Sequence, residues 1–199
     1  MKIIIIKYNA GNIRSVTNAL ARLGYEAEIT ADPRKIKEAD KVIFPGVGEA
    51  STTMAYLRET GLDEVITNLK QPVLGICLGM QLMCKHSEEG DVDCLGIFDE
   101  QVKKFQLPGP NVGNIKIPHM GWNKITNVNL PLFDKSLEGE YVYFVHSFYV
   151  AMGDDTAATT EYIHPYSSAL HKGNFYATQF HPEKSGSVGE RILSNFLML

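Results

Sequence analysis

The sequence predicts an α/β fold: one domain with a central, mostly parallel twisted sheet flanked by helices, and an antiparallel extension toward the C-terminus. Three observations predict it. Apolar strand-like runs alternate with helical patterns through the first half, which is the order of repeated βα units. Strand-like runs with few helices between them fill the second half. The length of 199 residues and the apolar share of 44% suit a single domain with a full hydrophobic core.

The first half predicts four strands and four helices, largely in βα order, with a glycine-rich stretch at 45–48 after the third strand. Residues 2–7 hold four isoleucines between lysines and predict a buried strand. A helix follows from Asn12, a plausible N-cap, to Gly24, a plausible C-terminal stop. The next elements are a strand at 27–30, a brief helix at 32–39 that opens with Asp-Pro, a strand at 41–44, helices at 51–58 and 62–70, and a buried strand at 73–77.

The second half predicts the antiparallel or mixed extension. Its expected strands lie at 96–105, 115–118, 141–150 and 174–180, and its closing helix lies at 189–199. That helix is expected to pack Ile192, Leu193, Phe196 and Leu197 inward. Residues 107–114 predict an exposed loop.

Composition excludes several classes of function. The formal net charge of -4 and the lack of a Lys/Arg block argue against nucleic-acid binding. The N-terminal apolar run is too short to cross a bilayer, so no membrane association is expected. Three cysteines without a CxxC pair predict neither a disulfide framework nor a metal site, and no motif indicates a cofactor. We therefore expect a cytoplasmic protein.

One cysteine stands at a strand-to-helix turn. In residues 72–81, Cys77 lies between Gly75 and Gly79, which is the G-x-nucleophile-x-G arrangement of a nucleophile elbow. The N-terminus of the following helix favours a thiolate at this position. A lone cysteine in an apolar run is more often a buried core residue, but the two glycines favour the nucleophile. Cys84 and Cys94 lack this context and are interpreted as core or incidental residues.

A histidine and a glutamate follow the last predicted strand in Gln-Phe-His-Pro-Glu at 179–183. In extended chain, His181 and Glu183 point to the same side, so the carboxylate can fix the imidazole tautomer and leave the other ring nitrogen free for a nucleophile. The alternatives are a surface turn or a metal pair, although no further ligands stand at a recognisable spacing. An elbow cysteine in the same chain favours catalysis.

With these residues the chain resembles class I glutamine amidotransferases over nearly its whole length. The resemblance rests on Pro-Gly-Val-Gly at 45–48, on the elbow at 75–81 and on His-Pro-Glu-Lys-Ser at 181–185. It implies that residues 1–199 form one type 1 glutamine amidotransferase domain. Within the family, residues 11–15, 118–123 and 143–147 most resemble the glutaminase subunits of imidazole glycerol phosphate synthases.

The resemblance implies a mechanism. Cys77 would attack the side-chain amide of glutamine, His181 would carry the proton to departing ammonia, and water would hydrolyse the glutamyl thioester. The expected oxyanion donors are the amide of Leu78 and an amide of Val47 or Gly48. The expected substrate-binding residues are Gln81, His146, Ser147 and Phe148. From the residues alone, Gln81 could equally be a helix-surface glutamine and His146 a structural histidine.

The resemblance also implies a partner, a (β/α)8-barrel cyclase subunit that forms a heterodimer with this chain. The cyclase would use the ammonia to form imidazole glycerol phosphate and aminoimidazole carboxamide ribotide in histidine biosynthesis. The residues assigned to the interface are Asn12, Ser15, Met120, Trp122, Tyr143 and Lys184. The only tryptophan could equally be a core residue. The family's first strand usually ends in Asp-Tyr-Gly, whereas this chain has Lys7, Tyr8 and Asn9 near the expected interface.

Three alternatives remain open at this point. The chain could supply ammonia to another enzyme, such as an anthranilate synthase, an aminodeoxychorismate synthase or a nucleotide synthetase. It could be a peptide hydrolase with a similar cysteine elbow. It could also be a binding subunit without catalysis, although the intact cysteine, histidine and glutamate argue against this.

Overall fold

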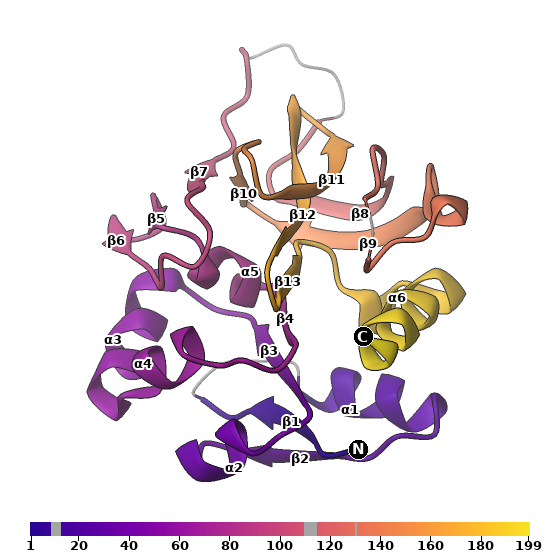
Figure 1. Ribbon diagram of the computed structural model, residues 1–199. Coiled ribbons are helices and arrows are strands. Elements are labelled where there is room, and N and C mark those ends of the chain that lie inside the picture. The colour runs from indigo at the N-terminus through magenta and orange to yellow at the C-terminus, as the bar shows by residue number, and fades with distance from the viewer. Residues whose placement is uncertain (9–12, 110–114, 130) are drawn as a thin grey trace.

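The computed structural model describes residues 1–8, 13–109, 115–129 and 131–199, and its central feature is one long mixed sheet (Figure 1). Five parallel neighbours form its first half, in the spatial order β2 (Ala27–Thr30), β1 (Ile3–Ile6), β3 (Lys41–Gly46), β4 (Val73–Cys77) and β13 (Phe175–Thr178). The four isoleucines of β1 are at most 2% exposed, because helices cover both faces of this half. Burial of each such side chain contributes roughly 1.5–3 kcal/mol.

The sheet continues from β13 mostly by antiparallel pairing. The next strands are β12 (Pro165–Lys172), β10 (Phe148–Val150), β7 (Gln101–Lys104), β5 (His86–Ser87) and β6 (Val92–Asp93), and β11 (Thr156–Glu161) pairs with β12. Only β5 and β7 pair in parallel here. Within the described ranges, β8 (His119–Lys124) and β9 (Tyr141–His146) form a separate antiparallel sheet.

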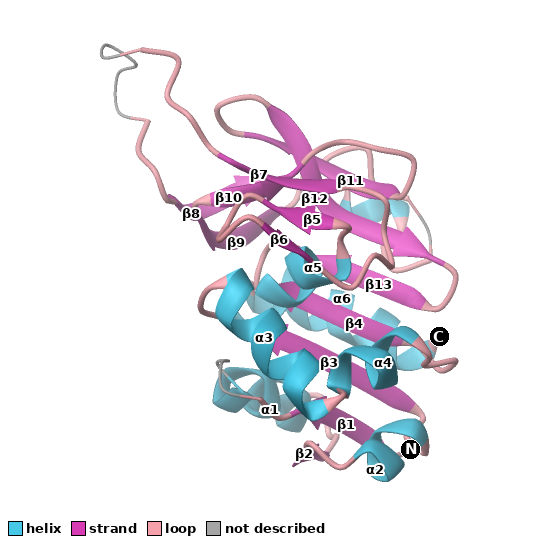
Figure 2. Cartoon of the chain, turned by 90° about the vertical axis from the view of Figure 1, so that its left-hand side faces the viewer, coloured by secondary structure: helices cyan, strands magenta, loops and turns pink. Residues whose placement is uncertain are grey.

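Helices cover the two faces of the parallel half (Figure 2). One face carries α1 (Ile13–Arg22) and α6 (Gly186–Met198), whose buried side chains share a core with alternate residues of β1 and β4. The other face carries α2 (Pro33–Lys37), α3 (Ala50–Thr60), α4 (Leu62–Thr67) and α5 (Leu78–Met83). Two short 3-10 helices, η1 (Lys135–Leu137) and η2 (Pro182–Lys184), lie in the second half. The predicted α/β fold with an antiparallel extension is therefore confirmed.

Several predicted boundaries in the second half are wrong. The strand expected at 115–118 is absent and β8 begins at the next residue, because Pro118 has no amide hydrogen to donate to a strand partner. The strand expected at 96–105 is shortened to β7, since Gly96 is left-handed and the amides of Ile97 and Phe98 donate to Met83. The strand expected at 141–150 is interrupted at Ser147.

Two other predictions fall at the limits of the described chain. The helix expected from Asn12 is α1, but Asn12 itself lies outside the described residues. The loop expected at 107–114 is described only to residue 109, and this part contains no helix or strand, with Leu107 exposed. Strands β5, β6, β8, β11 and β12 have no counterpart among the predicted elements.

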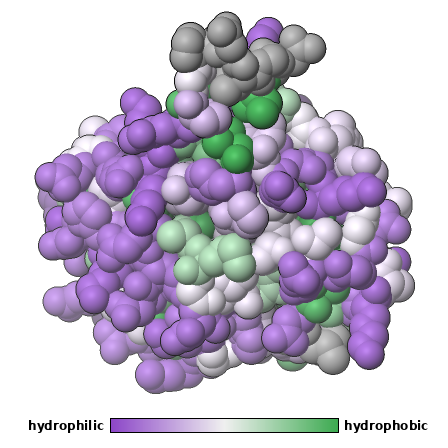
Figure 3. All heavy atoms as spheres, turned by 90° about the horizontal axis from the view of Figure 1, so that it is seen from above, coloured by the Kyte–Doolittle hydropathy of each residue, from purple (hydrophilic) through white to green (hydrophobic). Residues whose placement is uncertain are grey.

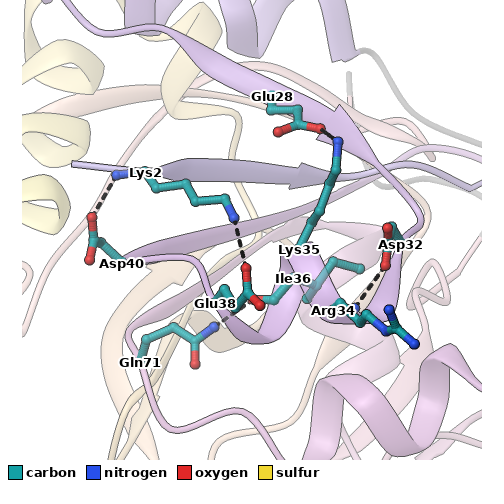
Figure 4. A network of polar contacts seen from close by, with 9 residues as sticks. All are labelled: Lys2, Glu28, Asp32, Arg34, Lys35, Ile36, Glu38, Asp40 and Gln71. Carbon is teal, nitrogen blue, oxygen red and sulfur yellow. Dashed lines mark hydrogen bonds and ion pairs between the residues drawn. The ribbon is translucent and has the colours of Figure 1, made fainter.

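A polar cluster joins the elements at the edge of the parallel half (Figure 4). In the strand order, this edge is the end of the sheet opposite its antiparallel strands. The Lys2 amide donates to Asp40 at 2.6 Å, its ammonium lies 3.5 Å from Glu38, and Lys35 pairs with Glu28 at 2.6 Å. These groups are largely exposed, and such ion pairs contribute at most about 1 kcal/mol each. They support the register of β1, β2 and α2 without forming a candidate site.

The outer surface is mixed in character. The face shown in Figure 3 is mostly hydrophilic, and its apolar side chains gather in a few small areas. No helix in the described part of the chain is both long and apolar enough to cross a membrane.

Candidate active site

Strand β4 delivers Cys77 to a strained turn at the carboxyl edge of the parallel half. The residue has φ 55° and ψ −109°, and α5 starts immediately after it. A positive φ is costly for a residue with a side chain, and packing on both sides must hold it in place. This conformation is the elbow that the sequence predicted, and Cys77, although largely buried, lines a pocket at this turn.

Glycines next to the elbow allow α5 to approach the sheet closely. A Cβ atom added to Gly79 would lie 1.9 Å from the carbonyl oxygen of Phe44 in β3, and one added to Gly46 would lie 2.8 Å from the Gly79 amide nitrogen. Both contacts are with backbone atoms, so side-chain rearrangement cannot relieve them. The small residues around Cys77 are therefore a packing requirement of the elbow.

His181 and Glu183 form a buried pair directly after β13. His181 precedes η2, and its Nδ1 lies 2.8 Å from Oε1 of Glu183. The sequence predicted that the two side chains meet along an extended strand. In the structure they meet through this 3-10 turn instead. His181 Nε2 is buried with no hydrogen-bond partner among the described residues, so this nitrogen is free to act on a substrate or nucleophile.

The environment of His181 favours its protonated form. Burial lowers the pKa of the imidazole, but the interaction with the neighbouring Cys77 sulfur, together with the hydrogen bond to the Glu183 carboxylate and its charge, outweighs burial and raises this pKa to about 10. The arrangement places an imidazole beside a thiol, with a buried carboxylate on the far side of the ring, which is the set of groups that an activated thiol nucleophile requires.

The end of β3 lies beside the elbow. Gly46 is the register partner of Cys77, so Val47 and Gly48 follow next to the sulfur. Gly48 has a φ of 126°, and Val47 is 40% exposed. Leu78 contributes the first amide of α5. All three predicted oxyanion residues thus lie around Cys77.

A pocket of about 320 Å³ opens above the sulfur. This volume lies at the lower end of the range found for small-molecule binding pockets. Its wall contains every predicted catalytic, oxyanion and substrate-binding residue except Glu183, which lies behind His181. The lining residues are Val47, Gly48, Cys77, Leu78, Gln81, Glu89, Pro118, Val145, His146, Ser147, Phe148 and His181.

Two of the predicted substrate-binding side chains already have protein partners. The Gln81 amide nitrogen donates to the Phe148 carbonyl at 3.0 Å and to Gln179 at 2.9 Å. His146 Nδ1 lies 2.7 Å from the same Phe148 carbonyl. Because a carbonyl can only accept, this nitrogen carries the hydrogen. Gln81 retains its carbonyl oxygen for a ligand, and His146 forms a fixed wall of the pocket.

Behind His146 lies a buried polar cluster with His119 and Tyr166. His146 Nε2 is 3.2 Å from His119 Nδ1 and 3.3 Å from the Tyr166 hydroxyl. Burial lowers the pKa of His119 to about 4 and that of His146 to about 3. Burial therefore favours the neutral form of both rings near pH 7.

Sequence reasoning missed Glu89 as a pocket residue. It belongs to the turn between β5 and β6, is half-buried, and accepts a hydrogen bond from the Ala50 amide at 3.0 Å. Burial and the nearby Glu49 carboxylate raise the pKa of Glu89. No spacing rule links this turn to the elbow, so no local signal marked it. The other two cysteines, Cys84 and Cys94, are not among the pocket-lining residues.

Four of the residues assigned to a partner interface lie on or beside β8 and β9: Met120, Trp122, Tyr143 and Lys184. Met120 and Trp122 are 63% and 55% exposed, which excludes the core alternative for the tryptophan. The Trp122 and Tyr143 rings pack edge to face at 6.0 Å, and the Lys184 ammonium lies 5.9 Å from the Tyr143 ring. Ser15 lies in α1 and is half-buried, while Asn12 is outside the described residues.

Comparisons with known proteins agree with this geometry. The family model of class I glutamine amidotransferases matches residues 4–199. The imidazole glycerol phosphate synthase subunit HisH of Bacteroides thetaiotaomicron is 67% identical over 199 residues, all of both chains. The protein of the same name from Vibrio parahaemolyticus is 43% identical over 205 residues, which cover 100% of this chain and 98% of the other.

Solved structures show the same fold. A crystal structure of a glutamine amidotransferase superposes with a TM-score of 0.73 at 19% identity, covering 98% of this chain and 97% of the other. The structure of PurLQS from Thermotoga maritima gives a TM-score of 0.69 at 16% identity, covering 99% and 97%. The full-length family match and the elbow geometry lead to one conclusion: this chain is a member of the class I glutamine amidotransferase family.

Proposed function

We propose that this chain is the glutaminase subunit of an imidazole glycerol phosphate synthase. It hydrolyses glutamine with Cys77, His181 and Glu183 and supplies the ammonia to a (β/α)8-barrel cyclase subunit. The observation that carries the proposal is the elbow cysteine beside a raised-pKa histidine at the base of a pocket of amino-acid size. The relatives named for this synthase, at 43% and 67% identity over the full chain, support it over the anthranilate and aminodeoxychorismate alternatives.

The first chemical step is acyl transfer to sulfur. The Cys77 thiolate attacks the side-chain amide carbon of glutamine, and a carbon–sulfur bond forms. The imidazolium of His181 gives its Nε2 proton to the amide nitrogen, the carbon–nitrogen bond breaks and ammonia leaves. Glu183, bonded to Nδ1, holds the ring in the tautomer that this transfer requires.

The second step hydrolyses the thioester. Neutral His181 takes a proton from water, the hydroxide oxygen attacks the acyl carbon, and the carbon–sulfur bond breaks to release glutamate and the thiolate. Both tetrahedral intermediates carry an oxyanion. We assign its donors to the Leu78 amide and to an amide of Val47 or Gly48, because these residues border the sulfur in the pocket wall.

Glutamine's amino-acid end is proposed to lie between Gln81 and Glu89, with His146, Ser147 and Phe148 forming the remaining wall. The Gln81 carbonyl oxygen and the Glu89 carboxylate are acceptors that suit an α-ammonium group. Burial of the Glu89 carboxylate without a cation raises its pKa, and the ligand's ammonium would supply the missing positive charge.

This assignment makes a prediction for Glu89→Gln. The neutral amide keeps the shape and can still accept from Ala50, but it loses the charge that binds the α-ammonium. We expect KM for glutamine to rise by roughly 10-fold or more, which corresponds to a charge-assisted hydrogen bond of about 1.5–3 kcal/mol, with little change in kcat. Steady-state glutamate release measures both constants. Glu88→Gln on the adjacent, outward-facing residue is the matched control, and an unchanged KM for Glu89→Gln would contradict the assignment.

The exposed aromatic side of β8 and β9 is the proposed docking surface for the cyclase. Met120, Trp122, Tyr143 and Lys184 gather there beside the short loop that carries His181. Strand β9 also reaches the site directly, since the Tyr143 carbonyl accepts from the His181 amide and the Val145 carbonyl lies 3.9 Å from the Cys77 sulfur. Docking on this surface would act on the catalytic residues through β9. Ser15 is proposed to extend the surface, whereas Asn12, the remaining residue assigned to the interface, lies outside the described residues.

Residues 1–199 are proposed to act as one glutamine amidotransferase domain in the cytoplasm. The thiol chemistry requires reduced cysteine, and Cys77, Cys84 and Cys94 are all free. No cofactor takes part in the proposed steps.

The proposal is tested by coupling between the two subunits. Glycines on both sides of Val47 let its peptide units take two orientations, so one oxyanion donor can be misdirected until the partner and its nucleotide-like ligand bind. A missing donor costs roughly 2.7–4 kcal/mol in the barrier, so we expect glutamate release to rise by about 100- to 1000-fold in the liganded complex. The assay compares the subunit alone, with cyclase, and with cyclase plus a substrate analogue. Full activity of the isolated subunit, unchanged by either addition, would contradict the coupling.

A further inference from the structure

A chain of three hydrogen bonds ends on the sulfur of Cys77. The Gln81 amide nitrogen in α5 donates to the Phe148 carbonyl at 3.0 Å and to Gln179 Oε1 at 2.9 Å. Gln179, directly after β13, donates from Nε2 to the Cys77 sulfur at 3.7 Å. Gln179 belongs to the motif that contains His181 and Glu183, but the mechanism above gives it no role.

The direction of this chain is fixed by a backbone group at its far end. The Phe148 carbonyl can only accept a hydrogen bond, so Gln81 must present its amino group to it. The second N–H of the same group then points at Gln179, and the atom that receives it must be the oxygen. Gln179 is thereby left with its N–H directed at Cys77. The reversed amide orientation would leave two donors, or two acceptors, facing each other.

Burial strengthens the interaction between this N–H donor and a negatively charged sulfur. Gln179 is 0% exposed and Gln81 is 4% exposed, so water does not compete for these hydrogen bonds. The Val145 carbonyl, 3.9 Å from the sulfur, can accept from a neutral thiol but repels a thiolate. A directed N–H opposes that repulsion and is strongest when the sulfur is charged.

We propose that Gln179 is a further catalytic residue, whose amide N–H stabilises the Cys77 thiolate, and that Gln81 is the positioning residue that keeps this N–H directed at the sulfur. This inference rests on the glutaminase function proposed above. The same donor serves both steps, since Cys77 is the nucleophile of the first step and the leaving thiolate of the second. His181 transfers a proton in both steps and Gln179 transfers none, so their roles are separate.

The experiment measures how readily Cys77 is alkylated by iodoacetamide as a function of pH, with the modified peptide followed by mass spectrometry. Gln179→Met keeps the length and volume of the side chain but removes the donor. The alkylation midpoint should move to higher pH by roughly one unit or more, the effect of a hydrogen bond to a charged group. In glutamate release, kcat should fall while KM stays nearly constant. The other titratable groups near the sulfur are the same in all variants; they are His181 with Glu183, His146, Tyr8 and Glu89.

Two further variants separate this role from a structural one. Gln81→Met removes the group that orients Gln179 and should move the midpoint in the same direction by a smaller amount; it also provides the test if Gln179→Met does not fold. Thr178→Val removes a neighbouring buried hydrogen bond, from Thr178 to the Phe180 carbonyl, and should leave the profile unchanged. An unmoved midpoint in the folded glutamine variants overturns the inference. Absence of glutamate release by the wild-type complex would instead overturn the proposed function, because the alkylation profile does not depend on turnover.

Discussion

Replacement of Cys77 by alanine is expected to abolish glutamine hydrolysis while the protein stays folded and still binds its partner. The substitution removes the atom that we propose to form the glutamyl thioester, and no other cysteine borders the pocket in the described structure. Loss of a nucleophile of this kind lowers kcat by roughly 10⁶-fold in enzymes with a comparable triad. Glutamate release by the cyclase-bound variant, next to its thermal unfolding midpoint and cyclase affinity, measures the effect.

The matched controls for this variant are Cys84→Ser and Cys94→Ser. Cys84 is fully buried and its sulfur faces the Met80 carbonyl at 3.5 Å, while the Cys94 sulfur faces Val92. Burial raises the pKa of both thiols, that of Cys94 to about 12, so neither is an activated nucleophile. Both variants should keep substantial activity. Turnover by Cys77→Ala, or a complete loss in a folded control, would disprove the assignment of the nucleophile.

The second large effect is expected for His181→Ala, with a smaller one for Glu183→Gln. Alanine removes the imidazole that we propose to carry the proton in both steps. We expect kcat to fall by roughly 10⁴-fold or more. Glutamine at 183 can still contact Nδ1 but no longer stabilises an imidazolium, so a loss of about 10²- to 10⁴-fold is expected.

Measurement of kcat in the liganded complex ranks the two variants. The pair is almost fully buried, with side-chain exposures of 2% and 1%, so both proteins must first be shown to fold and to bind cyclase. Equal losses, or a larger loss for Glu183→Gln, would contradict the assigned roles.

The parallel half of the fold could be predicted from the sequence because its strands carry local signals. The Ile-rich β1 and the apolar β4 are covered on both faces, and each precedes a helix with a recognisable start. Strands β11 and β12 carry no such signal. Their sequences, TAATTE and PYSSALHK, are buried but rich in small and hydroxyl-bearing residues, and they are specified by pairing with each other and with β13.

The candidate site likewise contains residues that the sequence could predict and residues that only the folded structure reveals. The elbow at Cys77 and the pair of His181 and Glu183 are each set by a few adjacent residues, so their motifs could be read directly. Glu89 reaches the pocket through the turn between β5 and β6, which depends on tertiary pairing. The contact of Gln179 with Gln81 joins residues 98 positions apart, and only the folded sheet brings them together.

We infer that glutamine nitrogen is released at Cys77 and consumed by a bound cyclase. An isotope experiment tests this by following amide-¹⁵N-labelled glutamine in the reconstituted complex with the cyclase's phosphorylated substrate, in the presence of excess unlabelled ammonium. We expect ¹⁵N to enter imidazole glycerol phosphate in step with glutamate formation, and Cys77→Ala to eliminate both. Product that carries the isotope ratio of bulk ammonium, or labelled product from the Cys77→Ala complex, would contradict it.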